Sequence, residues 1–379
     1  MMTYAAITGW GKCMPPAVLS NADLATFLDT DDEWITTRTG MKERRISHTP
    51  AVEMAYVASM RALACAGLKA TDIDLIVYGS CSFDEMVPNT ASGLQYKLGA
   101  KNAASMDVNT ACTSFLYSWT TANAMVRTGV VKRALVVGVE LISRYVDWDN
   151  RGIAVLFGDG CAAIVIEATE EKTGLLAETL GCISDARGIL RVAGYGATYA
   201  NVNVTFGDMA WTFDGPQIFK KAVLGMSDAS ARTLAKVGIT PEQIDLVVPH
   251  QANARIIESV AKYAGIPMSK VHVTVHKYAN MSAATVPVAL VEALEEKRIK
   301  PRAKLLMPAF GAGLTVCSHY AEWGERTTPK DVSDVELAPC DKTALQIVNE
   351  LRAAKDVRGR SAKGIAEAYC VDQRPYGTQ

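Results

Sequence analysis

The stretch Leu68-Lys-Ala-Thr-Asp-Ile-Asp-Leu-Ile-Val-Tyr78 recurs, with substitutions, as Ile239-Thr-Pro-Glu-Gln-Ile-Asp-Leu-Val-Val-Pro249. In each copy a short polar run with an aspartate leads into three or four apolar residues. The central isoleucines, Ile73 and Ile244, are 171 positions apart. A repeat at a fixed offset is the sequence signature of a duplicated structural unit.

Two further matches fall in the same register. Asn109 aligns with Asn280, and Arg133–Val137 aligns with Lys304–Pro308. Any one match could arise by chance, but three at one offset predict two copies of one unit.

Helical and β-like stretches alternate within each copy. The alanine-rich segment Val52–Ala66 precedes the apolar run Leu75–Val77, and Pro216–Lys236 precedes Leu246–Val248. Alternation of this kind is typical of mixed sheets covered by helices. The sequence therefore predicts a duplicated, layered α/β fold.

The predicted organisation has three parts. Residues 1–172 form the first copy, residues 173–324 the second, and residues 325–379 a C-terminal extension with one amphipathic helix, Lys342–Lys355. The extension is either a surface-packed appendage or an element that binds a partner or covers a dimer. The glycine-rich segment Ser184–Asp214 is expected to be an irregular insertion over the substrate entrance.

Composition excludes several classes of protein. The chain has 379 residues, 49% of them hydrophobic, and a net charge of −1, which argues against a nucleic-acid-binding protein. The apolar run Ile153–Ile166 is broken by Gly158-Asp159-Gly160, so no membrane span is expected. Nine cysteines without close pairing and no evident secretory signal favour a cytoplasmic protein with reduced thiols. No metal-ligand spacing is apparent.

Three residues at the ends of β-like runs carry the chemistry. Cys112 follows Asp107-Val-Asn-Thr-Ala111 and precedes an expected helix, whose N-terminus would favour a thiolate. His250 follows Val248-Pro249, and Asn280 follows Tyr278-Ala279. A thiol, an imidazole and a carboxamide suit covalent acyl transfer followed by stabilisation of an enolate.

These motifs and their spacing closely resemble the β-ketoacyl-acyl-carrier-protein synthase III family of the thiolase superfamily, over about residues 1–323. The resemblance implies a thiolase-like duplicated αβαβα fold, with the active site between the halves. It also implies a cytoplasmic homodimer whose substrates are acyl-CoA and malonyl-acyl carrier protein, with no metal or other cofactor. The acyl group would be transferred to Cys112, and His250 and Asn280 would then stabilise the enolate formed by decarboxylation of the malonyl group.

The resemblance also assigns binding residues. Trp34 and Arg38, in Asp31–Gly40, match the adenine clamp of acyl-CoA; Arg151 matches the nucleotide end, and Asn253 a pantetheine contact. Two cations at the tunnel mouth, Lys220 and Arg255, match positions that dock the acidic carrier protein.

Two positions near the thiol follow from the same comparison. Phe310 would shield the thiol, and the backbone N–H of Ala312 would complete an oxyanion hole. Val87 matches a segment that reaches the end of the partner's acyl pocket, where many acetyl-CoA users have Phe. The smaller side chain predicts a medium-chain acyl-CoA, unless neighbours such as Met86 or Ile142 fill the space.

The chain departs from the family pattern at three places. Alanine stands for the usual glycine at 312 and at 279, and Pro216 replaces a polar residue of the pantetheine wall. Two other functions stay open: a related acyltransferase or condensing enzyme of secondary metabolism with a different acceptor, and a non-catalytic partner subunit. The retained Cys112 argues against the second.

Overall fold

A computed structural model describes residues 3–197 and 209–357 of the chain. Nine strands form one sheet in the order β11-β12-β13-β8-β1-β7-β6-β4-β5. Their bounds are β1 Tyr4–Cys13, β4 Leu75–Gly79, β5 Ala104–Val108, β6 Arg133–Leu141, β7 Asp159–Thr169, β8 Gly174–Cys182, β11 Leu246–Val247, β12 Lys304–Gly311 and β13 Thr315–Glu322. The strands pair in both parallel and antiparallel directions, so the predicted mixed sheet is confirmed.

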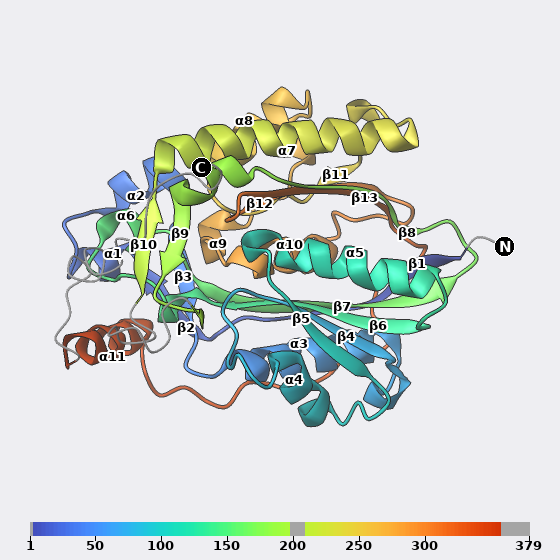
Figure 1. Ribbon diagram of the computed structural model, residues 1–379, viewed down its shortest axis with the longest axis horizontal. Helices are drawn as coiled ribbons and strands as arrows, with labels where there is room; N and C mark the ends of the chain where they lie inside the picture. Colours follow the sequence, from blue (N-terminus) through green and yellow to red (C-terminus); the bar gives the residue numbers. More distant parts are fainter. Residues whose placement is uncertain (1–2, 198–208, 358–379) are drawn as a thin grey trace.

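The two halves of the sheet, β11-β12-β13-β8 and β1-β7-β6-β4-β5, form two layers with helices between them (Figure 1). Helix α5 (Ser114–Arg127) and helix α10 (Thr285–Glu295) fill the middle, α3 (Ala51–Ala66) and α4 (Thr90–Leu98) lie below, and α7 (Gly215–Val237) and α8 (Ala254–Tyr263) lie above. All but the last residue of α10 are buried because it touches apolar strands on both sides. The result is the five-layered arrangement that the sequence predicts.

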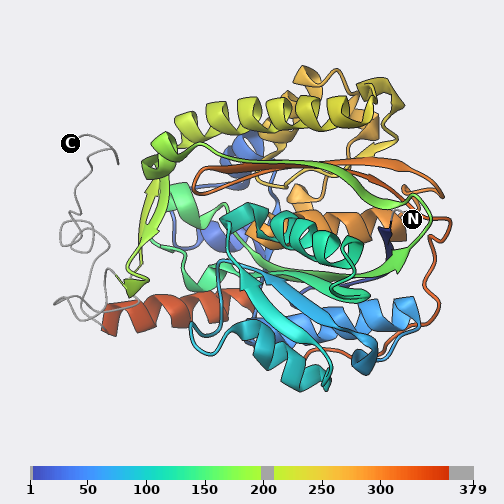
Figure 2. The ribbon, with the colours of Figure 1, turned by 45° about the vertical axis from the view of Figure 1, so that its right-hand side comes forward.

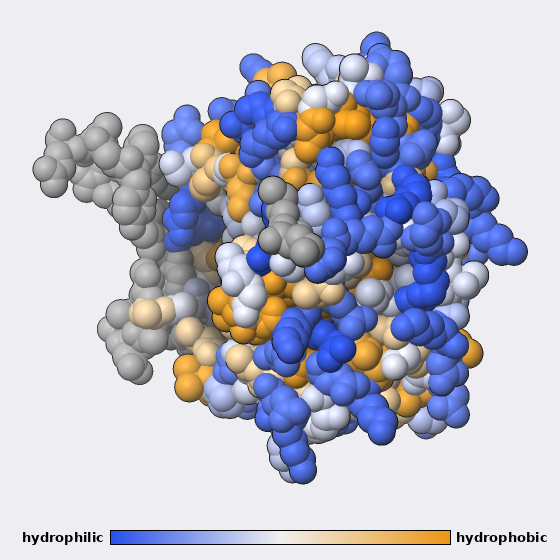
Figure 3. All heavy atoms as spheres, turned by 90° about the vertical axis from the view of Figure 1, so that its right-hand side faces the viewer, coloured by the Kyte–Doolittle hydropathy of each residue, from blue (hydrophilic) through white to orange (hydrophobic). Residues whose placement is uncertain are grey.

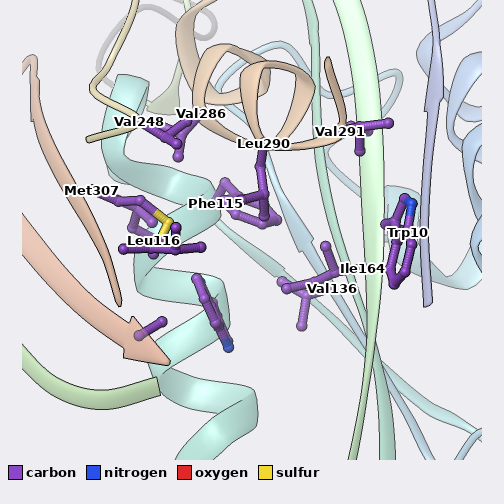
Figure 4. Close-up of a cluster of buried hydrophobic side chains, with 14 of the residues drawn as sticks. Trp10, Phe115, Leu116, Val136, Ile164, Val248, Val286, Leu290, Val291 and Met307 are labelled. Atoms are coloured by element: carbon purple, nitrogen blue, oxygen red, sulfur yellow. The ribbon is translucent and has the colours of Figure 1, made fainter. Parts of the chain in front are cut away.

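The core of the middle layer joins side chains from both halves of the chain. Phe115 and Leu116 from α5 meet Leu290 from α10 and Met307 from β12 (Figure 4). Burial of large apolar side chains of this kind contributes about 1.5–3 kcal/mol each. Packing of the two halves against each other therefore fixes the elements that carry Cys112, His250 and Asn280.

The order of the strands follows the predicted repeat. Strands β1 and β8 meet at the middle of the sheet through the register pair Ala5↔Gly174. From there the strand order is β1-β7-β6-β4 on one side and β8-β13-β12-β11 on the other, so each strand of the first half has an equivalent in the second. Helices α5 and α10 begin at Ser114 and Thr285, again 171 positions apart.

The remaining elements lie around one end of the sheet. They are β2 (Ala17–Ser20), α1 (Asn21–Ala25), α2 (Asp32–Thr39), β3 (Glu43–Ile46), α6 (Arg151–Ala154), α9 (Val275–Tyr278) and the hairpin β9–β10. The expectation that Ser184–Asp214 is irregular is wrong for its described part, because Leu190–Ala193 pairs with Ala210–Phe213 in this hairpin. Residues 198–208 of the segment lie outside the described residues. Pro216 occupies the first turn of α7, where a missing N–H is tolerated.

The described part of the C-terminal extension runs along the outside of the first half and includes α11 (Ala344–Val357). The guanidinium of Arg326 donates to the carbonyl of Thr8 and lies 4.9 Å from the Trp10 ring. Further along, Glu336 pairs with Arg61, and the ring of His48 hydrogen-bonds the carbonyl of Ala338. α11 confirms the predicted helix, shifted by two residues, and Figure 2 shows it below the hairpin β9–β10.

No helix in the described parts of the chain is both long and apolar enough to cross a membrane. Hydrophilic side chains cover much of the face in Figure 3, with apolar side chains between them.

Candidate active site

Cys112 lies in a tight turn between β5 and α5. We call residues 109–114 the cysteine turn. Its backbone is held by local hydrogen bonds: the Ala111 N–H donates to Oδ1 of Asn109 at 3.1 Å, and the Ser114 hydroxyl donates to the Ala111 carbonyl at 2.6 Å. Ala111 has a φ of 52°, in the left-handed region, which bends the chain sharply before the thiol.

Asn280 lies in a second turn, residues 280–285, which we call the asparagine turn. The Ser282 N–H donates to Oδ1 of Asn280 at 2.8 Å, so the amide orientation is fixed and Nδ2 is the end left to donate. The backbone of Asn280 is also held, by Asn280 N–H to Leu156 O at 3.0 Å and Gly158 N–H to Asn280 O at 3.1 Å. Leu156 and Gly158, which directly precede β7, therefore anchor this turn.

Ser282 joins the three predicted residues. Its side chain lowers the pKa of the Cys112 thiol and lies 3.6 Å from the Cys81 thiol. Its N–H holds Asn280, and its carbonyl accepts from the Thr285 hydroxyl at 3.0 Å. Thr285 Oγ1 in turn lies 2.6 Å from Nδ1 of His250. Residues from both halves of the chain thus meet around one serine.

Burial controls the protonation of both reactive groups. It raises the pKa of the Cys112 thiol to about 12, and the contact with Ser282 offsets only part of that rise. The start of α5 therefore does not yield a resting thiolate, contrary to the expectation from sequence. Burial also lowers the pKa of His250 to about 3, so this imidazole is neutral near pH 7.

The Thr285 hydroxyl bears on which nitrogen of His250 holds the proton. A hydroxyl has one hydrogen to donate. If it donates to the Ser282 carbonyl, Nδ1 of His250 must carry the hydrogen of the 2.6 Å contact, and Nε2 is then an acceptor. If it turns to Nδ1, Nε2 carries the hydrogen and is a donor.

The turn between β12 and β13 lies against the cysteine turn. A Cβ added to Gly311 would lie 2.9 Å from the Cys112 backbone nitrogen, which shows how closely the two backbones approach. The Thr315 hydroxyl also donates to the Thr110 carbonyl at 3.0 Å. Gly313 has a φ of 134°, whereas Ala312 is not in the left-handed region, so alanine fits there and its N–H is preserved. Phe310, at the end of β12, is buried.

The other alanine that stands for glycine is in a different situation. Ala279, directly before the asparagine turn, is fully buried, with φ 53° and ψ −154°. This conformation is costly for any residue with a Cβ. The substitution at 279 therefore stores strain next to Asn280, whereas that at 312 does not.

The predicted nucleotide residues gather around one ring. The guanidinium carbons of Arg38 and Arg151 lie 4.5 and 4.7 Å from the centroid of the Trp34 ring. Nδ2 of Asn253 donates to the Arg38 carbonyl at 3.1 Å, while its Oδ1 caps α8, so this carboxamide joins α8 to α2. Two exposed cations beside a half-buried indole suit a phosphate-bearing aromatic ligand.

The two predicted docking cations lie on neighbouring helices. Lys220 on α7 and Arg255 on α8 are both exposed, and Arg255 lies 5.9 Å from the ring of Phe219. They form a small basic site on the side of the molecule where α7 and α8 pack together.

Val87 is 88% exposed, and Met86 and Tyr96 are 54% and 86% exposed. It therefore lines no pocket within a single chain.

Sequence reasoning missed Ser282, Thr285 and the buried carboxyl of Glu140. Glu140 hydrogen-bonds Ser82 and accepts from the Cys81 thiol at 3.3 Å and the Ala283 N–H at 3.2 Å; burial raises its pKa. An acidic residue inside the apolar strand β6 was the signal that could have found it. Among the residues that the structure describes, no group of three or more His, Cys, Asp or Glu could hold a metal ion.

Known proteins share both this sequence and this fold. The chain matches the families "3-Oxoacyl-[acyl-carrier-protein (ACP)] synthase III" over residues 106–184 and "3-Oxoacyl-[acyl-carrier-protein (ACP)] synthase III C terminal" over residues 234–323. It is 50% identical to β-ketoacyl-[acyl-carrier-protein] synthase III 2 of Vibrio cholerae over 347 residues, 92% of this chain and 96% of that protein. The chain belongs to the 3-oxoacyl-[acyl-carrier-protein] synthase III family.

Further synthase III proteins extend this result. β-Ketoacyl-[acyl-carrier-protein] synthase III of Roseiflexus castenholzii is 40% identical over 85% of this chain and 99% of its own length. The crystal structure of 3-oxoacyl-[acyl-carrier-protein] synthase III from Aquifex aeolicus is 38% identical, with a TM-score of 0.79 over 84% of this chain and 100% of that one. The predicted family, the thiolase-like fold and the class of condensing acyltransferase are therefore confirmed.

Proposed function

We propose that this chain acylates Cys112 from an acyl-CoA and condenses the acyl group with malonyl-acyl carrier protein, releasing CO2 and β-ketoacyl-carrier protein. The observation that carries the proposal is the convergence of Cys112, His250 and Asn280 on Ser282. A thiol alone would serve many acyl transfers. Two neutral donors beside it are required only where an enolate forms.

Acylation begins from a protonated thiol. Because the pKa of Cys112 is raised to about 12, the proton leaves as sulfur attacks the thioester carbonyl. Nε2 of His250 accepts that proton when Nδ1–H faces Thr285, and CoA departs as a thiolate that takes the proton. The backbone N–H groups of Cys112 and Ala312 would bind the developing oxyanion.

Condensation uses the other tautomer of the same imidazole. With the Thr285 hydroxyl turned to Nδ1, Nε2–H of His250 and Nδ2–H of Asn280 donate to the malonyl thioester oxygen. Loss of CO2 places charge on that oxygen, and the enolate carbon then attacks the acyl-Cys112 carbonyl. The sulfur leaves as a thiolate and takes up one proton from water, which balances the charge left by the carboxylate that departed as CO2. The reaction requires no cofactor, because CO2 loss drives it.

Trp34, Arg38 and Arg151 are proposed to bind the nucleotide of acyl-CoA, with Asn253 beside the pantetheine. The proposed carrier-protein contact is the basic site of Lys220 and Arg255, whose charge suits an acidic partner.

A cytoplasmic homodimer is the proposed working form. Strand β5 is the outermost strand of the sheet, and the exposed Val87 and Tyr96 lie in the loop and helix beside it. An open sheet edge flanked by exposed apolar side chains supports pairing with a second copy. In that dimer Val87 would close the partner's acyl pocket and leave room for a medium-length chain.

Intact-mass measurement tests the first half-reaction. Purified protein is incubated with acyl-CoAs of graded length, and malonyl-carrier protein is then added for product analysis. We expect an acyl adduct, best with about six to ten carbons by methylene counting, that is converted to β-ketoacyl-carrier protein. An adduct that is passed to another acceptor but not to malonyl-carrier protein would favour the secondary-metabolism alternative.

The mutation Val87→Phe tests the pocket separately. We expect it to shift preference back toward acetyl-CoA while leaving the condensing chemistry intact. A wild-type kcat/KM higher for acetyl-CoA than for octanoyl-CoA would contradict the pocket proposal alone.

A further inference from the structure

Helix α11 of the C-terminal extension packs against strands β2 and β3. Ala344, Ile347 and Val348, spaced as one face of a helix, are each at most 4% exposed. They join the same apolar cluster as Ile35 of α2 and Ile153 of α6. Helix α11 is thus part of the apolar core to which α2 and α6 also contribute, rather than a loose appendage.

Arg352 on this helix has two partners. Its Nε and Nη2 atoms donate to Oδ1 of Asp149 at 3.2 and 3.1 Å. Its guanidinium carbon also lies 4.5 Å from the centroid of the Phe27 ring. One planar cation therefore bridges two loops that are far apart in sequence.

Both loops lead directly to the nucleotide clamp. Phe27 stands two residues before Asp29, whose carbonyl accepts from Nη1 of Arg151 at 2.6 Å and whose carboxylate lies 3.5 Å from it. Asp149 stands two residues before Arg151, and the intervening Asn150 caps α6 through the Gly152 N–H at 2.9 Å. Arg352 thus holds both sides of the Asp29–Arg151 contact.

We propose that Arg352 is a positioning residue for acyl-CoA, which fixes Arg151 beside the Trp34 ring where the nucleotide binds. This inference rests on the proposed function, because it takes the Trp34 site to bind the nucleotide. The match to the Vibrio cholerae relative, at 347 residues, is longer than residues 1–324 and so reaches into the extension. The Aquifex aeolicus structure covers only 84% of this chain.

The expected effect is confined to the nucleotide end of the substrate. Loss of Arg352 should weaken the hold on Arg151, but it leaves Cys112 and the asparagine turn untouched. KM for acyl-CoA should therefore rise while kcat stays constant, which is the signature of lost binding energy that the ground state and the transition state share equally. An acyl-pantetheine, which lacks the nucleotide, should react equally well with either protein.

The test compares octanoyl-CoA with octanoyl-pantetheine as acyl donors for the full-length variants Arg352→Ala, Arg352→Lys and Asn349→Ala. Asn349 is exposed on the same helix and serves as the matched control. We expect Arg352→Ala to raise KM for octanoyl-CoA about three- to tenfold, Arg352→Lys to raise it less, and Asn349→Ala to leave it unchanged. Constants for octanoyl-pantetheine should be the same in all four proteins.

Two results would overturn the role of Arg352 alone: an unchanged KM for octanoyl-CoA, or an equal loss with both donors, which indicates a general structural defect. If the wild-type protein used both donors equally well, the assignment of the Trp34 site to the nucleotide would be wrong, and the proposed role of Arg352 would fail with it. Should Arg352→Ala fold poorly, as judged by its Tm, the milder Arg352→Lys decides by the same comparison.

Discussion

The cysteine turn and the asparagine turn have the same backbone conformation and the same pattern of hydrogen bonds. In the first, the Ala111 N–H donates to the side chain of Asn109; in the second, the Ser282 N–H donates to that of Asn280. Both Ala111 and Ser282 are in the left-handed region, with φ values of 52° and 46°. Each pair is separated by the 171 positions of the repeat.

The hydroxyl that closes each turn is equivalent as well. Ser114 donates to the Ala111 carbonyl, and Thr285 donates to the Ser282 carbonyl. These residues begin helices α5 and α10. The two turns therefore have the same hydrogen bonds and the same sharp bend before a buried helix.

The two turns differ in what surrounds them. The first carries the thiol of Cys112, where the second has Ala283. Asn109 is exposed, but Asn280 is only 8% exposed, and Thr285 contacts His250 whereas its equivalent Ser114 lies in no such pair. The same turn thus presents a nucleophile in one half and hydrogen-bond donors in the other, so function follows the substituents rather than the backbone.

Removing the nucleophile should have the largest effect. We expect Cys112→Ala to abolish the acyl-enzyme in intact-mass measurements, because none of the other cysteines in residues 3–197 and 209–357 lies in such a turn. Cys182→Ala, which removes an exposed thiol, should acylate normally. A full-occupancy adduct on Cys112→Ala would refute the assignment.

The two asparagines offer a direct test of the comparison. Asn280→Ala should lower the condensation rate on the order of 10²–10³-fold, the usual cost of one oxyanion-type donor, and His250→Ala should behave alike. Acylation should change far less in both variants. Asn109→Ala removes the equivalent side chain without a catalytic role, so condensation should persist with only a modest loss of stability. Equal kinetic losses at 109 and 280 would mean that both asparagines act only through the turn.

The pH dependence of stability tests the burial of His250, which contacts the asparagine turn through Thr285 but has no equivalent partner at the cysteine turn. Burial lowers the pKa of His250 to about 3, so between about pH 6.5 and 3 the unfolded chain binds a proton that the native state excludes, and stability falls as the pH falls. Replacing it, as in His250→Asn, should reduce the slope of unfolding free energy against pH by up to about 1.4 kcal/mol per pH unit over pH 5.5–4.5. The comparison with wild type is essential, because Asp159, with a pKa raised to about 6, acts in the opposite direction. Parallel slopes in denaturant titrations would show that His250 is not buried as described.

The smallest expected effect concerns the strain before the asparagine turn. Ala279→Gly should raise the free energy of unfolding by about 1 kcal/mol, since glycine adopts φ 53° without steric cost. Ala312→Gly is the matched control and should give no such gain, because Ala312 is not in that region. Denaturant unfolding of the two variants side by side distinguishes a relieved turn from a general effect of glycine.

Much of this molecule could be predicted from its sequence. The offset of 171 residues predicted the repeat because equivalent strands bury the same apolar pattern, and the helix in the extension followed from its apolar spacing. The central position of Ser282 between Cys112, Asn280 and Thr285 could not be predicted, since it depends on side-chain proximity between segments 170 residues apart. The resting state of Cys112 was also missed, because helix position is visible in sequence whereas the depth of burial is not.

The position of α11 after both halves of the fold has a consequence for biosynthesis. Chains are made from the N-terminus and tend to fold in that order. Trp34, Asp149 and Arg151 emerge from the ribosome well before Arg352, so the contacts of Arg352 with the nucleotide site cannot form until translation has passed that residue. A nascent or prematurely terminated product could thus contain every catalytic residue and still hold acyl-CoA poorly.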